Sequence, residues 1–359
     1  MKNIILLENS ARVNLGGGQK VSLYVADILL KDNKIVFADF TNQSRYWEII
    51  EEKYKYSKKI CLKGANFTYK SKLLNWFLEF FLLLFYAPLN IKKLYAQIEK
   101  YNTLVYVTTK KGLLYAYILY LLYKVPYIYH CHLVENKNTF SFFIFRHLTN
   151  KAKKIICVSK SVFETIDHPH KIIIYNPILN TKGIKKTKNN NKFIVAAVGS
   201  LIEIKGFEYF IKAAIQVNPN IEFRIYGEGR LKNELSQLAH NRVKFMGFSN
   251  KIIEELYKSI DIIVMPTIIK EALPLTILEA KSVGIPSIVT NIGGQAEIVR
   301  NEVDGFHVPI KDSNSIKNKI ELLISDLSLY NKMSMEAFKS SYMFNYSIFS
   351  KKIEDCFNL

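Results

Sequence analysis

The feature that most constrains the fold of this chain is the regular alternation of short apolar runs, typical of strands, with longer helical segments. Residues 1–8 read as a first strand, and 193–198 and 261–266 read as buried strands further along. Strands that alternate with helical crossovers predict parallel sheets. The chain has 359 residues, of which 49% are apolar, and this is enough for two cores. We therefore predict an α/β protein with two doubly wound parallel-sheet domains.

A polar segment in the middle of the chain marks the boundary between the domains. Residues 181–192 are basic and rich in asparagine, and they lack any apolar period. Such a stretch is typical of an interdomain linker. We therefore place an N-terminal domain at 1–182 and a C-terminal domain at 183–343.

The positive charge of the chain is concentrated in its first half. The net charge is +19, and residues 1–182 contribute +15 of it against +4 for 183–359. A basic half predicts a large anionic partner, either an anionic membrane face or a nucleic acid. Lysine and asparagine are abundant along the whole chain, so a lysine-rich proteome is a third explanation.

The most apolar segment, residues 73–89, is too short and too interrupted to span a membrane. Glu79 lies in its middle, Pro88 is expected to end it, and a span needs ~20 residues. Lysines flank it on both sides, which fits an interfacial helix that enters one leaflet. A core helix of the first domain fits equally well. The apolar run 112–123 is predicted to be a buried crossover helix.

The cysteines and the N-terminus both point to a cytosolic protein. The four cysteines are scattered and form no CxxC pair, so neither a zinc site nor a disulfide scaffold is indicated. They are Cys61, Cys131, Cys157 and Cys356. The apolar run in residues 1–8 is too short for a secretory signal. We expect the protein in the cytoplasm or on the inner face of the cell membrane.

Two glutamates that flank a predicted helix start carry the strongest indication of function. Glu271 is expected on the loop that enters the helix and Glu279 inside it, with Pro274 in the first turn. The amides of Leu275 and Thr276 would then lie at the positive end of the helix dipole, where a phosphate binds. A phosphate flanked by two carboxylates suits a sugar nucleotide, whose hydroxyl groups can bind the acids.

The motifs around these glutamates follow a fixed order. Upstream lie 195–201, Lys205-Gly206, 223–229 and 243–247, and downstream lie 284–290, Gly293-Gly294 and 304–308. From Phe193 to Pro309 this order resembles the retaining glycosyltransferases of group 1 (family 4). The resemblance implies the GT-B architecture, in which two Rossmann-like domains face a cleft. It also implies that a C-terminal helix, here within 344–359, returns to complete the first domain.

The resemblance assigns donor-binding roles to residues of the second half. Lys205 would contact the diphosphate, Glu279 the ribose hydroxyls, and Glu271 the donor sugar near the reacting carbon. Ser200 stands where the family commonly has an arginine, so one expected cation is missing. Four further residues would line the nucleotide pocket, the first pair beside the nucleotide and the second pair at the base. They are Gly227, Glu228, Phe245 and Met246.

In the first half, a glycine loop and a histidine strand are candidate site elements. Gly17 and Gly18 follow the first strand and precede a helical run, an arrangement that suits phosphate. The resemblance implies that this loop faces the donor phosphate and the acceptor. It also places a catalytic histidine at the end of the strand 127–132, with His132 preferred and His130 second. A metal bound by these histidines is not expected, because no third ligand is nearby.

Together these features predict a hexosyltransferase that uses a nucleoside-diphosphate sugar, with a UDP sugar favoured. The acceptor would be lipid-linked or a polysaccharide, in synthesis of a bacterial-type surface glycan such as lipopolysaccharide or capsule. The resemblance implies retention at the anomeric carbon and no tightly bound metal. An anionic membrane surface is the expected partner, and nucleic acid is not. The alternatives are a GT-B-fold sugar-nucleotide epimerase and a basic nucleic-acid-binding protein.

Overall fold

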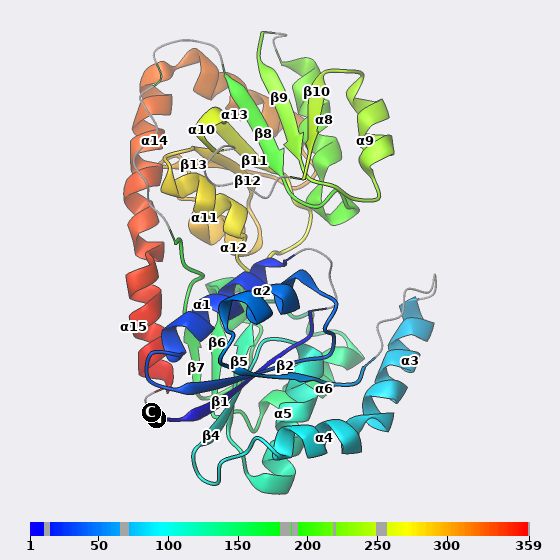
Figure 1. Cartoon of the computed structure of the whole chain (residues 1–359). Helices are drawn as coiled ribbons and strands as arrows, with labels where there is room; N and C mark the ends of the chain where they lie inside the picture. Colours follow the sequence, from blue (N-terminus) through cyan, green and yellow to red (C-terminus); the bar gives the residue numbers. More distant parts are fainter. Residues whose placement is uncertain are drawn as a thin grey trace. The chain divides into compact units, whose positions relative to one another are not determined.

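The computed structural model of the chain describes residues 1–10, 15–64, 72–179, 188, 193–217, 220–248 and 257–357. Side chains at 72–77, 80 and 258 lie outside this description. The predicted linker at 181–192 also lies outside it, apart from Lys188. The chain divides into two compact units, each built on its own parallel sheet (Figure 1). The predicted α/β fold class is therefore confirmed.

Unit 1 comprises residues 1–158, 162–174 and 350–359. Its described strands form a seven-stranded parallel sheet of order β3-β2-β1-β4-β5-β6-β7. The strands are β1 (Asn3–Glu8), β2 (Lys34–Asp39), β3 (Lys58–Cys61), β4 (Thr103–Val107), β5 (Tyr127–Cys131), β6 (Lys154–Cys157) and β7 (Lys171–Ile173). The helices are α1 (Gly17–Leu29), α2 (Arg45–Lys53), α3 (Lys72–Phe85), α4 (Ala87–Tyr95), α5 (Lys110–Tyr123), α6 (Phe140–Thr149) and α7 (Lys160–Phe163), whose first two residues group with unit 2.

Unit 2 comprises residues 159–161 and 175–349. Its described strands form a six-stranded parallel sheet of order β10-β9-β8-β11-β12-β13. The strands are β8 (Ile194–Val198), β9 (Glu222–Tyr226), β10 (Val243–Gly247), β11 (Ile262–Met265), β12 (Ser287–Thr290) and β13 (Gly305–Val308). The helices are η1 (Glu203–Lys205), α8 (Phe207–Gln216), α9 (Lys232–Ala239), α10 (Tyr257–Ser259), α11 (Leu275–Ser282), α12 (Gly293–Ile298), α13 (Ser313–Ser325), α14 (Leu327–Ser341) and η3 (Tyr342–Phe344).

Both sheets have a point at which the strand order reverses. In unit 1 it lies between β1 and β4, and in unit 2 between β8 and β11. Because parallel crossovers are right-handed, helices on the two sides of this point cover opposite faces of the sheet. Ligands of such folds bind at the carboxyl ends of the strands beside the reversal. Each sheet therefore has one favoured edge for a site.

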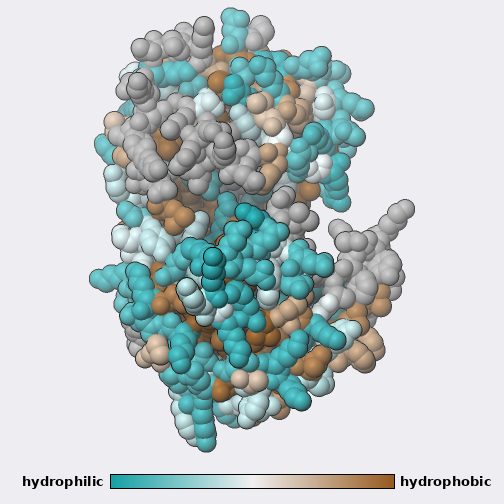
Figure 2. All heavy atoms as spheres, in the orientation of Figure 1, coloured by the Kyte–Doolittle hydropathy of each residue, from teal (hydrophilic) through white to brown (hydrophobic). Residues whose placement is uncertain are grey.

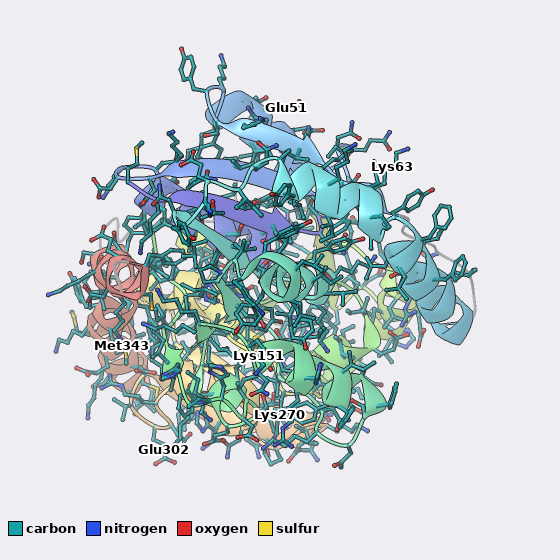
Figure 3. All side chains as sticks on the ribbon, turned by 90° about the horizontal axis from the view of Figure 1, so that it is seen from below. Glu51, Lys63, Lys151, Lys270, Glu302 and Met343 are labelled. Atoms are coloured by element: carbon teal, nitrogen blue, oxygen red, sulfur yellow. The ribbon has the colours of Figure 1, made fainter. Side chains whose placement is uncertain are left out.

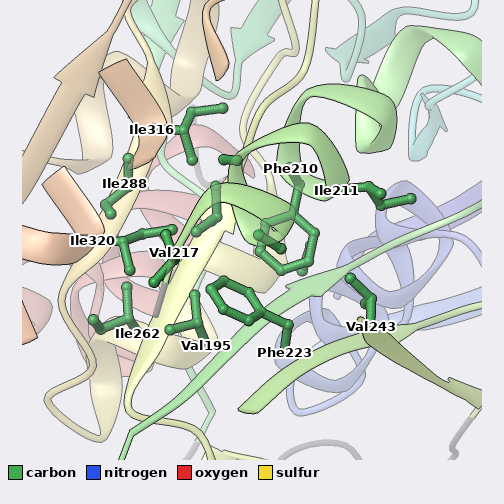
Figure 4. Packing of buried hydrophobic residues seen from close by; sticks show 14 of the residues in the cluster. Val195, Phe210, Ile211, Val217, Phe223, Val243, Ile262, Ile288, Ile316 and Ile320 are labelled. Atoms are coloured by element: carbon green, nitrogen blue, oxygen red, sulfur yellow. The ribbon is translucent and has the colours of Figure 1, made fainter. Parts of the chain in front are cut away.

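The core of unit 2 explains why its strands read as unbroken apolar runs. Val195, Phe223 and Ile262 lie on neighbouring strands and belong to one buried cluster with Phe210 and Ile211 of α8 (Figure 4). All five are at most 1% exposed. Strands that are covered on both faces need apolar residues at successive positions rather than alternate ones.

The last helix, α15 (Tyr346–Phe357), ends in unit 1. The ring of Phe357 lies 5.7 Å from that of Tyr106 on β4, and the Lys2 ammonium donates to the carbonyl of Phe357. The chain passes from unit 1 to unit 2 after Ile174, earlier than the boundary predicted at 182/183. The segment after Ile174 packs on unit 2, where the N–H of Ile178 donates to the carbonyl of Phe344 at 2.8 Å.

The apolar segment 73–89 forms parts of two helices, and one of our predictions for it is wrong. Pro88 does not end the helix; α3 ends at Phe85, and Pro88 lies in the first turn of α4, where its missing N–H costs nothing. Leu83 is buried, whereas Phe81 and Phe85 are 65% and 64% exposed. No helix among the described residues is long and apolar enough to cross a bilayer.

The helix predicted at 112–123 is only partly buried. It is observed as α5, and Leu113, Ala116 and Leu119 are fully buried against the sheet. Its last turn is exposed, with Leu122 at 60%. The prediction of a buried helix therefore fails in this last turn.

Candidate active site

Lys205 is positioned by a one-turn helix that is fixed to a neighbouring loop. η1 follows the end of β8, and the carbonyl of Ile204 accepts a hydrogen bond from the Thr267 hydroxyl at 2.7 Å. Gly206 has a φ of +64°, and a Cβ there would lie 2.1 Å from the carbonyl oxygen of Pro266. Glycine is therefore required for the close contact between η1 and the segment that follows β11.

Glu271 is positioned by the glycine pair that begins α12. The N–H of Gly294 donates to the carbonyl of Glu271 at 2.7 Å. A Cβ on Gly294 would lie 1.8 Å from the carbonyl oxygen of Ala272, and Gly293 has a φ of +63°. The backbone of the glutamate loop thus lies directly on the turn that opens α12, a contact that side chains at these positions would prevent.

Lys205 and Glu271 meet in an ion pair, although 66 residues separate them in the chain. The ammonium donates to Glu271 Oε1 at 2.7 Å, and the two side chains are 20% and 17% exposed. They follow β8 and β11, the two strands at the reversal of the sheet, so the pair lies at the favoured edge of unit 2. Its partial exposure leaves the charges accessible to a ligand.

Helix α11 supplies the remaining part of the predicted phosphate seat. It begins at Leu275, and Pro274 is its extended N-cap residue, one position earlier than we predicted. The amides of Leu275 and Thr276 open the helix, and its first turn holds no acidic residue. The first N–H groups of a helix lack intrahelical partners and favour anions.

Glu279 lies in the second turn of α11 and is held by a residue that we did not predict. The hydroxyl of Tyr257 donates to Glu279 Oε2 at 3.0 Å. Tyr257 is fully buried, and burial together with the nearby carboxylate raises the pKa of its hydroxyl well above the ordinary value. The hydroxyl therefore remains a donor at physiological pH. No pattern around Tyr257 in the sequence indicates this contact.

The other predicted nucleotide residues lie at the ends of β8, β9 and β10. A Cβ on Gly227 would lie 1.9 Å from the carbonyl oxygen of Gly199, so the two turns are in backbone contact. Ser200 is exposed. Glu228 is half-exposed and pairs with Lys232 one turn further on, at 2.8 Å.

At the end of β10, the two predicted base-reading residues differ in their surroundings. Phe245 packs partly against the core of unit 2, whereas Met246 is 47% exposed. The strand is irregular between Phe245 and Gly247. Of the two side chains, that of Met246 is therefore the more accessible.

In unit 1 the glycine loop and the predicted histidine are neighbours. Gly17 and Gly18, which we predicted to precede the helix, are instead its first two residues, because α1 begins at Gly17. A Cβ on Gly18 would lie 3.3 Å from Cγ of His132. Burial lowers the pKa of His132 to about 4, so its ring is neutral at pH 7. Within the described part of the chain, its Nε2 has no hydrogen-bond partner.

His130 is set deeper than His132. Its Nδ1 lies 2.6 Å from the Tyr106 hydroxyl, and its ring is fully buried at 4.3 Å from that of His132. This position favours His132 as the histidine that meets a ligand. Among the described residues, no group of three or more histidine, cysteine or carboxylate side chains is arranged to hold a metal.

A buried pair of carboxylates at the same edge of unit 1 was not predicted as part of the site. Glu8 and Asp39 are register partners at the ends of β1 and β2. The Thr108 hydroxyl donates to Glu8, and Ser10 donates to Asp39 from both its N–H and its hydroxyl. Burial raises the pKa of Glu8 to about 7 and also raises that of Asp39. The only sequence signal is that an acid ends each apolar strand.

Two parallel-sheet units, each with one reversal of strand order, place this protein in the GT-B class of folds. HepE of Anabaena, solved in complex with UDP and glucose, has this fold with a TM-score of 0.81 and 19% identity over the whole of both chains. Residues 180–340 match the family described as glycosyl transferases group 1. This part of the chain is therefore similar to the glycosyl transferases of group 1.

Two curated relatives carry more specific names. The first is the UDP-Gal:alpha-D-GlcNAc-diphosphoundecaprenol alpha-1,3-galactosyltransferase of Escherichia coli. It is 37% identical over 175 residues, 45% of this chain and 44% of the relative. The second is an N,N'-diacetylbacillosaminyl-diphospho-undecaprenol alpha-1,3-N-acetylgalactosaminyltransferase of Campylobacter jejuni, 28% identical over 67% of this chain and 64% of the relative. The chain thus spans less than two thirds of the length of either relative.

Proposed function

We propose that the protein is a retaining glycosyltransferase that moves a hexose-type sugar from a UDP sugar to a lipid-linked acceptor. The observation that carries this proposal is the ion pair of Lys205 and Glu271 beside the N-terminus of α11. It combines a cation, helix amides and a carboxylate, and a nucleoside-diphosphate sugar needs all three. The names of the two relatives, which specify acceptors on diphosphoundecaprenol, support the choice of acceptor.

In this mechanism the donor diphosphate takes the place of Glu271 as the partner of Lys205. The amides of Leu275 and Thr276 and the Lys205 ammonium stabilise the charge that grows on the diphosphate as its bond to the sugar breaks. The freed Glu271 carboxylate accepts a hydrogen bond from a sugar hydroxyl and stabilises the positive charge at the anomeric carbon. Glu279 binds the ribose hydroxyls.

The acceptor step requires a proton to leave the attacking hydroxyl. The acceptor oxygen forms its bond on the face from which the diphosphate departs, and the leaving phosphate oxygen takes the proton, so the configuration is retained. His132, neutral because burial lowers its pKa, serves as a hydrogen-bonding group toward the sugar and not as a cation. We propose that no tightly bound metal takes part.

Exposed apolar side chains on unit 1 suggest where the enzyme meets its acceptor. We call this set the apolar helical surface; it lies on α3, the end of α5, and α6, and each member is between 41% and 72% exposed. Its members are Phe81, Leu84, Phe85, Leu121, Leu122, Tyr123, Phe140 and Phe143. In Figure 2 brown and tan atoms gather around α3 on the lower right. Apolar surface of this extent marks an interaction site.

Cations accompany the apolar helical surface. Lys92 and Lys124 are exposed at α4 and at the end of α5. Lys63, labelled in Figure 3, lies beside α4, where its backbone N–H donates to Asn90 Oδ1 at 2.8 Å. Aromatic side chains with lysines around them suit an anionic membrane face. We propose that the protein binds the inner face of the cell membrane and works there in surface-glycan synthesis such as that of lipopolysaccharide or capsule.

The donor site is tested by a screen of nucleotide sugars on the full chain, with thermal stabilisation and hydrolysis as readouts. UDP sugars should stabilise the wild type. Glu271→Gln should retain most of the binding and lose at least a hundredfold in turnover, whereas Lys205→Ala should weaken UDP itself about tenfold or more. Lys212→Ala, an exposed helix lysine in a pair with Glu208, is the matched control and should change neither.

Four results would contradict the proposal. Full turnover in Glu271→Gln or unchanged UDP affinity in Lys205→Ala would remove the assigned roles. Loss of turnover in EDTA, restored by a divalent cation, would show that a metal is needed. Conversion of a UDP sugar to its epimer without an acceptor would favour the epimerase instead.

A further inference from the structure

A pocket in unit 1 has no part in the donor site. It lies between α3, α5 and α6 and has a volume of about 310 Å³. This is within the range of small-ligand sites, which begins at about 300 Å³. Its walls are mainly aliphatic and aromatic side chains from all three helices. They are Leu83, Leu113, Leu114, Ile144, Phe145 and Leu148.

Charged side chains lie together at one end of this pocket. Glu79 of α3 and Lys111 of α5 form an ion pair at 3.0 Å, and both also line the pocket. Lys110, the first residue of α5, contributes a second cation and pairs with the buried Glu135 at 2.8 Å. A pocket with apolar walls and a charged end matches an amphiphile in which an anionic head follows a hydrocarbon chain.

The charged end lies at the edge of the sheet where the reacting groups are expected. α5 begins three residues after β4 ends, and β4 is a neighbour of both β1 and β5. The glycine turn before α1 follows β1, and His132 follows β5. A ligand whose head binds Lys110 and Lys111 therefore presents that head at the same edge as His132.

We propose that this pocket binds the hydrocarbon chain of the lipid-linked acceptor, with Lys110 and Lys111 at its phosphate. The inference rests on the proposed function, because it names the part of the acceptor that unit 1 holds. Phe81 and Phe140, on two of the helices that wall the pocket, belong to the apolar helical surface, so a chain can enter from a bilayer. The size of the pocket suits one chain, as in a lipid monophosphate or diphosphate, rather than the two chains of a phospholipid.

Calorimetric titration of the full chain with dodecyl phosphate, below its critical micelle concentration, tests the pocket. Inorganic phosphate provides the head alone, and dihexanoylphosphatidylglycerol provides a soluble lipid with two chains. Leu114→Trp fills the pocket from a half-buried position on α5. Tyr56→Trp is the control, which introduces the same side chain at a fully exposed position of unit 1 outside the apolar helical surface.

Dodecyl phosphate should bind the wild type saturably, and Leu114→Trp should weaken this binding at least tenfold, while Tyr56→Trp stays within twofold of the wild type. Lys111→Gln should weaken it about threefold or more, and the other two probes should bind weakly or not at all. Ile144→Trp fills the pocket from α6 and replaces Leu114→Trp if that variant does not fold. Equal binding by the pocket variant and the control overturns the inference, as do absence of binding and equal binding of the two-chain lipid.

UDP binding, measured on each variant, separates this inference from the proposed function. Normal UDP binding without dodecyl phosphate binding overturns the pocket alone and leaves the donor site in place. Absence of UDP binding in the wild type overturns the proposed function, and the lipid titrations still decide whether the pocket takes a hydrocarbon chain.

Discussion

At the scale of single residues, the two carboxylates proposed to bind the sugar nucleotide have different hydrogen-bond partners. Glu271 is bound by a cation that a diphosphate can attract away, whereas Glu279 is bound by the neutral hydroxyl of Tyr257. A neutral donor orients a carboxylate without cancelling its charge. Glu279 can then accept hydrogen bonds from a ribose while it keeps its bond to the protein.

Tyr257→Phe should therefore weaken binding of the sugar nucleotide and lower the stability of the protein only slightly. The variant loses one hydrogen bond, which lowers the free energy of unfolding by about 1 kcal/mol. The Kd for UDP should rise three- to tenfold, because Glu279 is no longer oriented. Tyr330→Phe removes a comparable buried hydrogen bond, from its hydroxyl to the carbonyl of Asp261 at 3.2 Å, and should leave UDP binding unchanged. Equal Kd values in the two variants would exclude an orienting role for Tyr257.

The raised pKa of Glu8 predicts a pH dependence of stability. Its pKa in the folded protein is about 7, above the ordinary value of 4.5, so the folded state binds the proton more tightly than the unfolded state. The stabilising effect of the protonated group is complete below pH 4.5 and is lost as the pH rises to 7. Glu8→Gln keeps a neutral acceptor for Thr108, so the variant should not lose this stability as the pH rises.

Urea unfolding at pH 4.5, 6 and 8 measures this effect. At pH 8 Glu8→Gln should be more stable than the wild type by on the order of 1–3 kcal/mol, and at pH 4.5 the two should be alike. Glu99→Gln, which changes an exposed carboxylate near Lys34, should show no such trend. A constant difference between Glu8→Gln and the wild type at all three pH values would mean that Glu8 does not titrate in this window.

At the scale of elements, the glycine pair at the start of α12 determines the position of Glu271. Gly294→Ala would place a methyl group against the carbonyl of Ala272, which must then move. Such overpacking costs about 1–3 kcal/mol of unfolding free energy, and UDP-sugar turnover should fall at least tenfold as Glu271 moves away from Lys205. Unfolding and turnover measure the two effects. Gly16→Ala, where a Cβ meets only ordinary contacts, is the control for stability. Normal turnover in Gly294→Ala would show that this contact does not set the position of Glu271.

The same elements show how far the sequence alone predicts this molecule. Both sheets follow from apolar runs such as Ile194–Val198, because a strand covered on both faces is apolar throughout. The break at Pro88 was misplaced because proline suits a first helical turn as well as a stop. The exposed end of α5 was missed because apolar sequence does not distinguish a core face from an interaction surface.

Within the site, each glutamate was assigned to the correct local element, but its partner was not predicted. Lys205 and Glu271 were both singled out, yet their contact depends on the order of β8 and β11 in the sheet. Tyr257 has no motif of its own and meets Glu279 only through the packing of α10 and α11. Periodicity determines local elements, whereas contacts across 22 or 66 residues depend on tertiary packing.

At the scale of the whole molecule, charge and apolar surface occur together in unit 1. Residues 1–182 carry most of the net charge, and the apolar helical surface lies in the same part of the chain. Electrostatic attraction brings such a protein to an anionic bilayer, and burial of aromatic side chains holds it there. Of these two contributions, added salt screens only the electrostatic one.

Flotation with lipid vesicles separates the two contributions. Vesicles that contain phosphatidylglycerol should bind the wild type at least tenfold more tightly than vesicles of phosphatidylcholine alone, and salt at about 0.5 M should abolish most of that difference. The double variant Phe81→Ser/Phe143→Ser should lose about tenfold or more in affinity at every salt concentration, because it removes apolar contacts that salt does not screen. Tyr56→Ser changes a fully exposed aromatic residue of unit 1 outside the apolar helical surface and should bind normally. If Tyr56→Ser weakened binding as much as the double variant, the membrane contact would lie elsewhere on the unit.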